Sequence, residues 1–475
     1  MNEKHEPIRD ARQLGYPKML LLGLQHMFAM FGATILVPIL VNSYFSDFYK
    51  TCNVQVLSIQ VTLFFAGVGT LFFHFCTKWK VPAFLGSSFA FLGGFSTIAS
   101  LNTGIYKGME ASEKIRYACG GIVVAGLLYI VLAIIVKLVG VQKVMRFLPP
   151  IVTGPIIISI GLTLASSAVS NCQSFWPLAF IALAVVIIFN ILGKGMFKIL
   201  PILMGVVISY IAAILLNAAG VTSASGDAIL NFSGVSGASF IGIPPFAFCK
   251  FDLTAILVMA PIALATMMEH IGDISAISAT VGENYIEEPG LHRTLIGDGL
   301  ATSFSALFGG PANTTYGENT GVLELSKVHD PRVVRIAAVF AIILSFIPKV
   351  SEIISSLPSA IIGGISFILY GMISAIGIRN IVENKVDLTK SRNLIIAAVI
   401  LVSALGFTQG LTFEIAGVSI TLTGLAIAAI AGIVLNAILP GNDYHFGKDP
   451  KIDANRGLDM IPNLHEDTSY ADDEE

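Results

Sequence analysis

Long apolar runs recur along this chain, and they limit its possible folds more than any other feature. A run of about 20 apolar residues is long enough to cross a lipid bilayer as a helix. We expect about fourteen such segments, numbered here as spans 1 to 14. They cover residues 17–42, 53–76, 82–100, 117–140, 147–168, 175–193, 197–219, 253–280, 292–309, 312–327, 333–348, 357–378, 393–409 and 417–438. The sequence therefore predicts an all-α polytopic membrane protein, in which spans 3 and 10 are short and interrupted by proline or glycine.

The composition is typical of a membrane protein and excludes several other classes of protein. Hydrophobic residues make up 55% of the chain and charged residues 12%, whereas soluble domains average about 25% charged residues. With a net charge of −3 and no strongly basic region, the chain is not expected to bind nucleic acid. Its five cysteines are scattered, without the spacing of a metal site or a disulfide framework. We therefore expect no metal and no cofactor.

The positive residues indicate how the chain is oriented. Lysine and arginine are enriched in the cytoplasmic connections of membrane proteins. If the N-terminus is cytoplasmic, most of the 28 lysines and arginines fall in segments on that same side. The exceptions are Lys50, Lys107, Lys114, Arg116, Lys250 and Lys349. This bias predicts an even number of spans in the cell membrane, with both termini in the cytoplasm.

The two halves of the chain share three short patterns in the same order. The matched pairs are Gln25-His26 with Glu269-His270, Leu148-Pro149 with Leu357-Pro358, and the broken segment 82–91 with 311–321. Seven spans separate the members of each pair, and because seven is odd, the second copy must be inverted. Inverted repeats with broken segments at matching positions indicate a transporter whose substrate site lies near the middle of the membrane.

Ionisable side chains inside the predicted spans are candidates for function, because a charge is costly at membrane depth. Glu318 lies in the broken span 10, Glu269 and Asp273 share one face of span 8, and Asp298 lies in span 9. Two like charges on one face disfavour simultaneous ionisation, which suits a proton-carrying pair. Structural alternatives stay open. Glu318 could be a solvated loop carboxylate, Glu269 could pair with His26 or the adjacent histidine, Asp298 could bond a broken segment, and His26 could serve packing alone.

The segment 313–321, Asn-Thr-Thr-Tyr-Gly-Glu-Asn-Thr-Gly, resembles the signature of the nucleobase-ascorbate transporter family in the form found in bacterial uracil permeases. Segments 24–34, 82–91 and 289–293, and the pair Glu269-His270, resemble the same family. The resemblance extends from about residue 18 to residue 440. It implies fourteen spans in a seven-plus-seven inverted repeat, with a short extended strand breaking each of spans 3 and 10.

The resemblance also implies two domains, each built from both halves of the chain. The core domain comprises spans 1–4 and 8–11, and the gate domain comprises spans 5–7 and 12–14. The expected organisation is a cytoplasmic N-terminal tail (1–16), core domain (17–140 and 253–348), gate domain (141–219 and 349–438), extracellular loop (220–252) and cytoplasmic C-terminal tail (439–475). Members of the family commonly work as homodimers, so a second copy of the chain is an expected partner within the lipid bilayer.

The implied activity is the import of uracil or a related pyrimidine base by proton symport, through an alternating-access mechanism of the elevator or rocking type. Uracil is flat and neutral, and it presents two N–H donors and two carbonyl acceptors. Its site needs both acceptors and donors, because an unmatched buried polar group costs about 1–3 kcal/mol. The carboxylates of Glu269 and Glu318 would accept, and by resemblance the backbone N–H groups of Phe89 and Gly317 would donate. The family-matched candidates for contact with the ring faces are Phe89, Tyr316, Tyr370 and Ala33.

The candidates for proton coupling are Glu269, Asp273, Asp298 and His26. Asp273 departs from the pattern, since uracil permeases often have histidine there and aspartate is commoner in the purine-transporting branch. A symporter for xanthine or another purine base is therefore the alternative, and sodium is the alternative coupling ion. The sequence has no Walker loop, zinc-protease motif or nucleophile elbow, so we expect no enzyme. A channel or a membrane-embedded enzyme is the alternative from another class.

Overall fold

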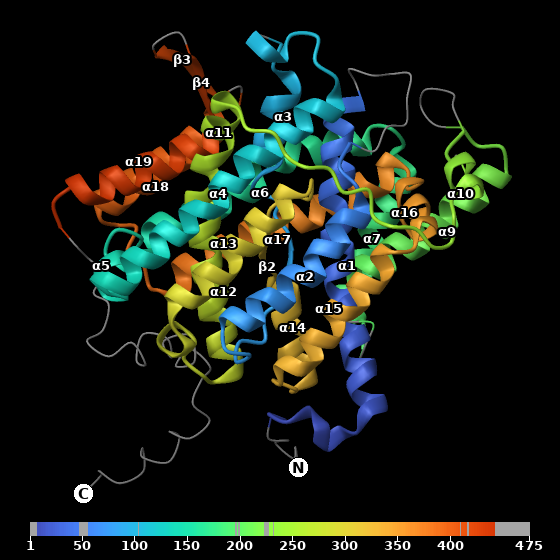
Figure 1. Ribbon diagram of the computed structural model, residues 1–475, viewed down its shortest axis with the longest axis horizontal. Coiled ribbons are helices and arrows are strands. Elements are labelled where there is room, and N and C mark those ends of the chain that lie inside the picture. The colour runs from blue at the N-terminus through green and yellow to red at the C-terminus, as the bar shows by residue number, and fades with distance from the viewer. Residues whose placement is uncertain are drawn as a thin grey trace, which may run out of the picture.

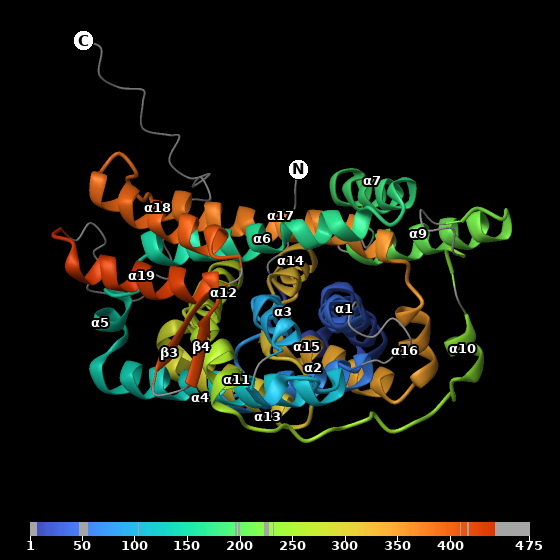
Figure 2. The same ribbon diagram turned by 90° about the horizontal axis from the view of Figure 1, so that it is seen from above.

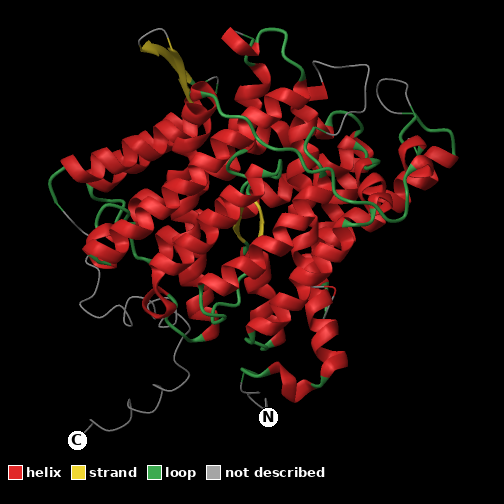
Figure 3. Cartoon of the chain, viewed as in Figure 1, coloured by secondary structure: helices red, strands yellow, loops and turns green. Residues whose placement is uncertain are grey.

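The computed structural model describes residues 7–46, 56–102, 104–194, 197, 200–222, 228–230, 232–408, 410–415 and 418–441. Most of the predicted C-terminal tail, the first residues of the N-terminal tail and the start of span 2 lie outside these ranges. The described chain is mostly helical (Figure 3). Within it, seven helices are long and apolar enough to cross a bilayer, or eight if the bent helix pair over residues 331–355 counts as one span.

Each predicted apolar segment coincides with a helix, or with a strand followed by a helix. The first half contains α1 (Tyr16–Ser46), α2 (Ile59–Cys76), β1 (Leu85–Ser87), α3 (Leu92–Ser100), α4 (Ala111–Val139), α6 (Pro150–Cys172), α7 (Trp176–Leu192) and α9 (Pro201–Ala218). The second half contains α11 (Leu253–Met259), α12 (Ala263–Val281), α13 (Leu291–Leu307), β2 (Asn313–Thr315), α14 (Gly317–Ser326), α15 (Pro331–Ser345), α16 (Pro348–Ser355), α17 (Ser359–Glu383), α18 (Ser391–Gly406) and α19 (Gly424–Ile438). Short helical turns occur at η1 (Ala11–Leu14), η2 (Gly104–Tyr106), α5 (Val141–Met145), α10 (Ser233–Gly237), η3 (Ala260–Ile262) and η4 (Ile286–Gly290).

Local sequence explains where many of these helices begin. Pro150, Pro201 and Pro331 stand in the first turn of their helices, where the missing N–H would have had no partner within the helix. Ser58 and Asp330 cap α2 and α15 with a side-chain oxygen that accepts a backbone N–H. The breaks between apolar segments therefore follow from the positions of proline and capping residues.

The expectation of a helical span from residue 417 is wrong for the described residues 418–422. Strands β3 (Leu411–Ile415) and β4 (Val418–Leu422) form an antiparallel hairpin, and α19 starts only at Gly424. β-branched residues are frequent on both strands and favour extended backbone, and the hydroxyl oxygens of Thr412 and Thr421 lie 2.9 Å apart across the pair. The hairpin projects beyond the helices at the upper left of Figure 1. In addition, α16 follows α15 after a bend of 85° and packs against α2 and α10.

The helices form two layers when the molecule is seen from above (Figure 2). One layer contains α6, α7, α9, α17, α18 and α19, and the other contains α1, α2, α3, α4, α11, α13 and α15. Helices α12 and α14 lie between the layers and contact each other. The strands β1 and β2 lie near the centre of the molecule, enclosed by helices (Figure 3).

Helix contacts recur when each helix is replaced by the equivalent helix of the other half, seven segments away. Helix α2 packs on α15 as α13 packs on α4, α7 packs on α17 as α18 packs on α6, and α7 packs on α9 as α18 packs on α19. The pairs α2–α13 and α6–α17 join equivalent segments of the two halves. Helices α6 and α17 approach each other closely, because a Cβ added at Gly377 would lie 2.7 Å from the carbonyl oxygen of Gly154.

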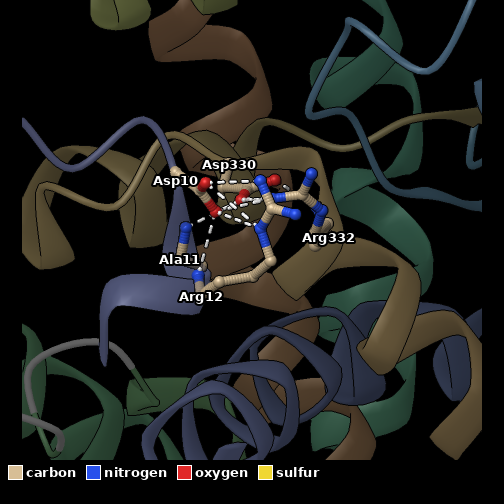
Figure 4. Close-up of polar contacts among 5 residues, drawn as sticks. All are labelled: Asp10, Ala11, Arg12, Asp330 and Arg332. Atoms are coloured by element: carbon tan, nitrogen blue, oxygen red, sulfur yellow. Dashed lines mark hydrogen bonds and ion pairs between the residues drawn. The ribbon is translucent and has the colours of Figure 1, made fainter. Parts of the chain in front are cut away.

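The described end of the N-terminal tail is fastened to the start of α15 (Figure 4). The Ala11 N–H donates to the buried carboxylate of Asp330 at 2.7 Å. The Arg332 guanidinium lies 3.0 Å from Asp330 and 2.7 Å from Asp10. The Arg12 side chain donates to Asp10 and holds the pKa of that carboxyl well below its ordinary value of 3.8. Backbone and charged contacts together therefore dock this segment on the helices.

Candidate functional site

The two broken segments meet as an antiparallel pair of strands, β1 and β2, at the centre of the fold. Their three residue pairs are Leu85 with Thr315, Gly86 with Thr314, and Ser87 with Asn313, all of them buried. The ladder extends by one bond at each end, with Ser88 N–H donating to Ala312 at 2.9 Å and Tyr316 N–H donating to Phe84 at 3.0 Å. Unpaired backbone is costly where water is excluded, so each broken segment supplies hydrogen-bond partners for the other.

Tyr316 lies across the strand pair at Gly86. Its hydroxyl donates to the carbonyl oxygen of Ser87 at 2.8 Å, and its side chain is buried. A Cβ at Gly86 would overlap the Tyr316 ring and lie 2.7 Å from the hydroxyl oxygen of Thr34 on α1. Only glycine leaves room for this ring, so position 86 fixes where the aromatic face of Tyr316 lies.

Three of the predicted carboxylates gather beside the strands. Glu269 and Asp273 lie one helical turn apart on α12, and Glu318 lies in the first turn of α14, directly after β2. Asp273 accepts a hydrogen bond from the Thr315 hydroxyl at 2.8 Å. Oε2 of Glu269 is buried without a hydrogen-bond partner among the described residues, and Asp273 and Glu318 both act on Glu269 electrostatically. An acceptor left without a donor in such a place is available to a ligand N–H or to a proton.

The fourth acidic candidate, Asp298 on α13, is arranged differently. It is fully buried, and one carboxylate oxygen lies 3.2 Å from Nδ1 of His270, which is also fully buried. The rings of Phe73 and Tyr129 stand edge-on to the His270 imidazole, with ring centroids 6.2 and 6.4 Å away. Within the described residues, Asp298 therefore lies against a histidine on α12, its carboxylate oxygens have no hydrogen-bond partner, and a bond to a broken segment is not found.

His26 on α1 is tied to the helix that carries Glu318. The side-chain amide of Asn319 donates to the carbonyl oxygen of His26 at 3.0 Å and lies 3.2 Å from its Nδ1. The alternative in which Glu269 pairs with His26 or His270 is not found among the described contacts, because His26 contacts Asn319 and His270 contacts Asp298. His26 therefore joins α1 to α14 immediately after Glu318.

Two aromatic candidates meet between the two helix layers. Phe89, which follows β1, lies edge-to-face with Tyr370 of α17, with ring centroids 6.0 Å apart and planes at 76°. Both side chains are buried. Tyr370 is the predicted site residue that comes from the layer containing α17. Ala33 is buried on α1, two turns after His26.

A cavity of about 170 Å³ reaches Glu318 between the layers. Its lining residues are Phe28, Ala29, Asn190, Leu200, Pro201, Ile202, Leu203, Glu318, Gly321, Leu325 and Met372. A single water needs only about 10–15 Å³ of such space, so the cavity can admit a small planar molecule together with water. Its wall is mostly apolar with one carboxylate, as is usual for a small-molecule site.

The structure thus brings Glu269, Asp273, Glu318 and Tyr316 to the strand pair, and it places Phe89 and Tyr370 against each other. Gly317 begins α14 beside them. Sequence reasoning missed Asn319, although it lies within the quoted motif. It also missed Thr70 and Thr302, whose hydroxyls bond the strands. Apart from their position in spans equivalent under the predicted repeat, nothing in the sequence marks these two threonines.

Comparison with known proteins gives a consistent set of relatives. The sequence profile of the Permease family matches residues 17–413. The chain is 40% identical to a uracil permease of Bacillus caldolyticus over 456 residues, covering 93% of this chain and 96% of that protein. It is 39% identical to a uracil permease of Bacillus subtilis over 436 residues, covering 88% and 91% of the two chains.

Solved structures with a similar fold are more distant in sequence. The transmembrane domain of a cyanobacterial bicarbonate transporter, BicA, matches with a TM-score of 0.57 and 15% identity, covering 90% of this chain and 99% of that one. SLC26A9 matches with a TM-score of 0.59 and 12% identity, covering 90% of this chain and 66% of that one. At such low identity the likeness concerns the fold alone.

Proposed function

The chain belongs to the nucleobase-ascorbate transporter family of permeases, and from that premise we propose that it imports uracil by proton symport. It is a multi-pass membrane transporter and not an enzyme. The observation that carries the proposal is the buried strand pair with Glu269 and Glu318 beside it. The choice of uracil rests on the relatives. Both are named uracil permease, and the match covers nearly their whole length.

The site matches the chemistry of a planar pyrimidine. Glu269 and Glu318 accept the two ring N–H groups, and the backbone N–H groups of Phe89 and Gly317 donate to the two carbonyl oxygens. The rings of Tyr316 and Phe89, together with the small side chain of Ala33, cover the faces of the base. Tyr370 closes the site from the other layer. The unpartnered Oε2 of Glu269 supports this assignment, because a buried acceptor needs a donor.

Transport requires the site to open to one side of the membrane at a time. In the proposed organisation, fourteen spans form a seven-plus-seven inverted repeat, which the recurring helix contacts support. The layer with α1–α4 is the core domain (17–140 and 253–348), and the layer with α6 and α17 is the gate domain (141–219 and 349–438). In this proposal, with both termini in the cytoplasm, the cavity at Glu318 is the opening toward the cytoplasm, and the contact between Phe89 and Tyr370 closes the site toward the outside. Alternating access then consists of rigid movement of one domain against the other.

Proton coupling follows from the carboxylates. Protonation of Glu269 removes a buried charge and allows the base to bind in register, and the carboxylates of Asp273 and Asp298 both act electrostatically on Glu269. His26 orients the start of α14, where Glu318 lies. Accumulation requires that proton and base each favour binding of the other.

Uptake of labelled uracil and labelled xanthine tests the proposal in cells that lack their own nucleobase permeases. We expect uracil to accumulate against its gradient, faster at pH 6 than at pH 8, and to be released by a protonophore. We also expect that replacement of sodium by choline will leave uptake unchanged. Sodium-dependent uptake would refute proton coupling, and uptake without accumulation would favour a channel.

A purine base is the second candidate, because Asp273 stands where uracil permeases often have histidine and it bonds Thr315 of β2. Faster uptake of xanthine than of uracil would establish that alternative.

Glu269→Gln tests the coupling step. It mimics permanent protonation, so we expect retained binding of uracil and loss of uphill uptake. Accumulation by this variant at the parental level would refute the role of Glu269. Cross-linking in membranes tests the proposed homodimer in the cell membrane.

A further inference from the structure

Two threonine hydroxyls bond the outward edges of the strand pair. A two-stranded ladder is barely stable by itself, and alternate N–H and C=O groups on each strand point away from the partner strand. Thr70 on α2 accepts the Leu85 N–H at 2.9 Å and donates within its own helix to Ala66 at 2.7 Å. Thr302 on α13 accepts the Asn313 N–H at 3.2 Å and donates to the Asn313 carbonyl oxygen at 2.8 Å.

The two bonds occupy equivalent places in the fold. Leu85 is the first residue of β1, and Asn313 is the first residue of β2. Helices α2 and α13 are the second segments of their respective halves, and they pack against each other. Both threonines are fully or almost fully buried, so water does not replace their hydroxyls as partners of the strand amides.

The segments that these bonds hold lead directly to the proposed substrate donors. Phe89 follows β1 by two residues, and Gly317 follows β2 by two residues. A shift of either strand therefore moves a donor N–H relative to the base. Binding sites tolerate displacements of only about 0.5 Å before hydrogen bonds are lost.

We propose that Thr70 and Thr302 are positioning residues that hold β1 and β2 in the register required for binding the base. The hydroxyl of each accepts the strand amide that has no partner in the ladder. The inference rests on the proposed function only for its consequence on binding. The bracing of the strands does not depend on which base is carried.

The test compares valine and serine at each position in the full-length protein in lipid nanodiscs. Thr70→Val and Thr302→Val keep the shape and remove the hydroxyl, whereas Thr70→Ser and Thr302→Ser keep the hydroxyl. Thr62→Val on α2 and Thr294→Val on α13 are matched controls. Among the described residues, these buried hydroxyls bond local carbonyl oxygens and not the strands, namely that of Ser58, which caps α2, at 2.8 Å and that of Leu291 at 3.0 Å.

Two readouts separate this inference from the proposed function. The first is amide hydrogen exchange of peptides over 84–88 and 312–316 without ligand, which we expect to be faster in both valine variants and unchanged in the serine and control variants. The second is equilibrium binding of labelled uracil, expected to weaken roughly ten- to a hundred-fold in the valine variants, since a buried donor loses its partner, and by less than about three-fold with serine.

Parental exchange and parental binding in the valine variants would overturn the inference. If the parent protein itself binds no uracil, the proposed substrate fails, and the exchange comparison still decides on the bracing. Should a valine variant fail to give monodisperse protein, cysteine at the same position replaces it, because a thiol is a weak hydrogen-bonding group of similar size to the serine hydroxyl. Equal exchange in the cysteine and serine variants would then overturn the inference.

Discussion

Gly86→Ala is a minimal change that acts directly on the strand pair. The added methyl group would overlap the Tyr316 ring and lie 2.7 Å from the Thr34 hydroxyl oxygen, whereas unstrained contacts are about 3.5–4.0 Å. The ring is buried and held by its hydroxyl bond to Ser87, so it has little freedom to turn away. Relief of the overlap therefore requires β1 to move away from Tyr316, which opens the ladder.

The expected size follows from other overpacked cores. Insertion of a methyl group into a filled interior costs about 1–3 kcal/mol. If this strain falls on the form that binds the base, uracil affinity drops by roughly 5- to 150-fold, since about 1.4 kcal/mol is a factor of ten. We expect lower thermal stability of the purified protein as well, because the protein without ligand must either keep the overlap or open the ladder.

Gly93→Ala provides the matched control. Gly93 lies seven residues further on, in α3, and a Cβ there meets nothing within 4 Å. Alanine in a helix is favoured over glycine by about 1 kcal/mol, so this variant should bind uracil normally and unfold at an equal or higher temperature. Thermal unfolding and equilibrium binding of labelled uracil are measured side by side. Parental affinity and unfolding temperature in Gly86→Ala would refute the close packing of Tyr316 on β1.

Three further predictions concern groups outside the strand pair. Asp330→Asn should weaken the docking of the N-terminal segment by about 1 kcal/mol, because the Ala11 N–H then bonds a neutral amide oxygen in place of a charged carboxylate. Faster tryptic cleavage of this segment measures the change, and an unchanged rate would contradict it. The pKa of Asp10 is lowered, chiefly by Arg12, so its contribution to docking is complete above about pH 4 and is lost only as the pH falls further; a spin label on η1 that loosens between pH 7 and pH 5 would contradict this. Lys114→Met should lower the unfolding temperature, because the buried ammonium group donates to two carbonyl oxygens at the end of α3, at 2.9 and 2.6 Å, and unpaired acceptors cost about 1–3 kcal/mol each; an unchanged unfolding temperature would mean that water replaces the lysine.

The helical segments and the two broken spans could be predicted because apolar length and proline or glycine breaks are local signals. The hairpin over residues 411–422 could not, because a short apolar run rich in β-branched residues reads equally well as the start of a helix. The docking of Asp10 on Arg332 joins residues far apart in sequence, and no local pattern announces such a contact.

The candidate site also has parts that could be predicted from the sequence and parts that could not. Glu269 and Glu318 could be selected from sequence, because a carboxylate in an apolar segment is expensive wherever that segment packs. The partners of the charged groups could not. The pairing of Asp298 with His270 depends on how α12 and α13 are rotated against each other, and that rotation is set by tertiary packing. The threonine bonds to the strands could not be predicted either, since a buried threonine most often bonds a carbonyl of its own helix.

A label on the docked N-terminal segment would report on the helices that this segment contacts. Ile8 bridges Val328, and Arg9 contacts Glu283 beyond the end of α12, so η1 is held to elements that carry the carboxylates. Gln13 on η1 and Ser391 at the start of α18 are both exposed. A donor and acceptor dye at these two positions would report, as a change of fluorescence, the movement of one helix layer against the other that the proposed transport mechanism requires.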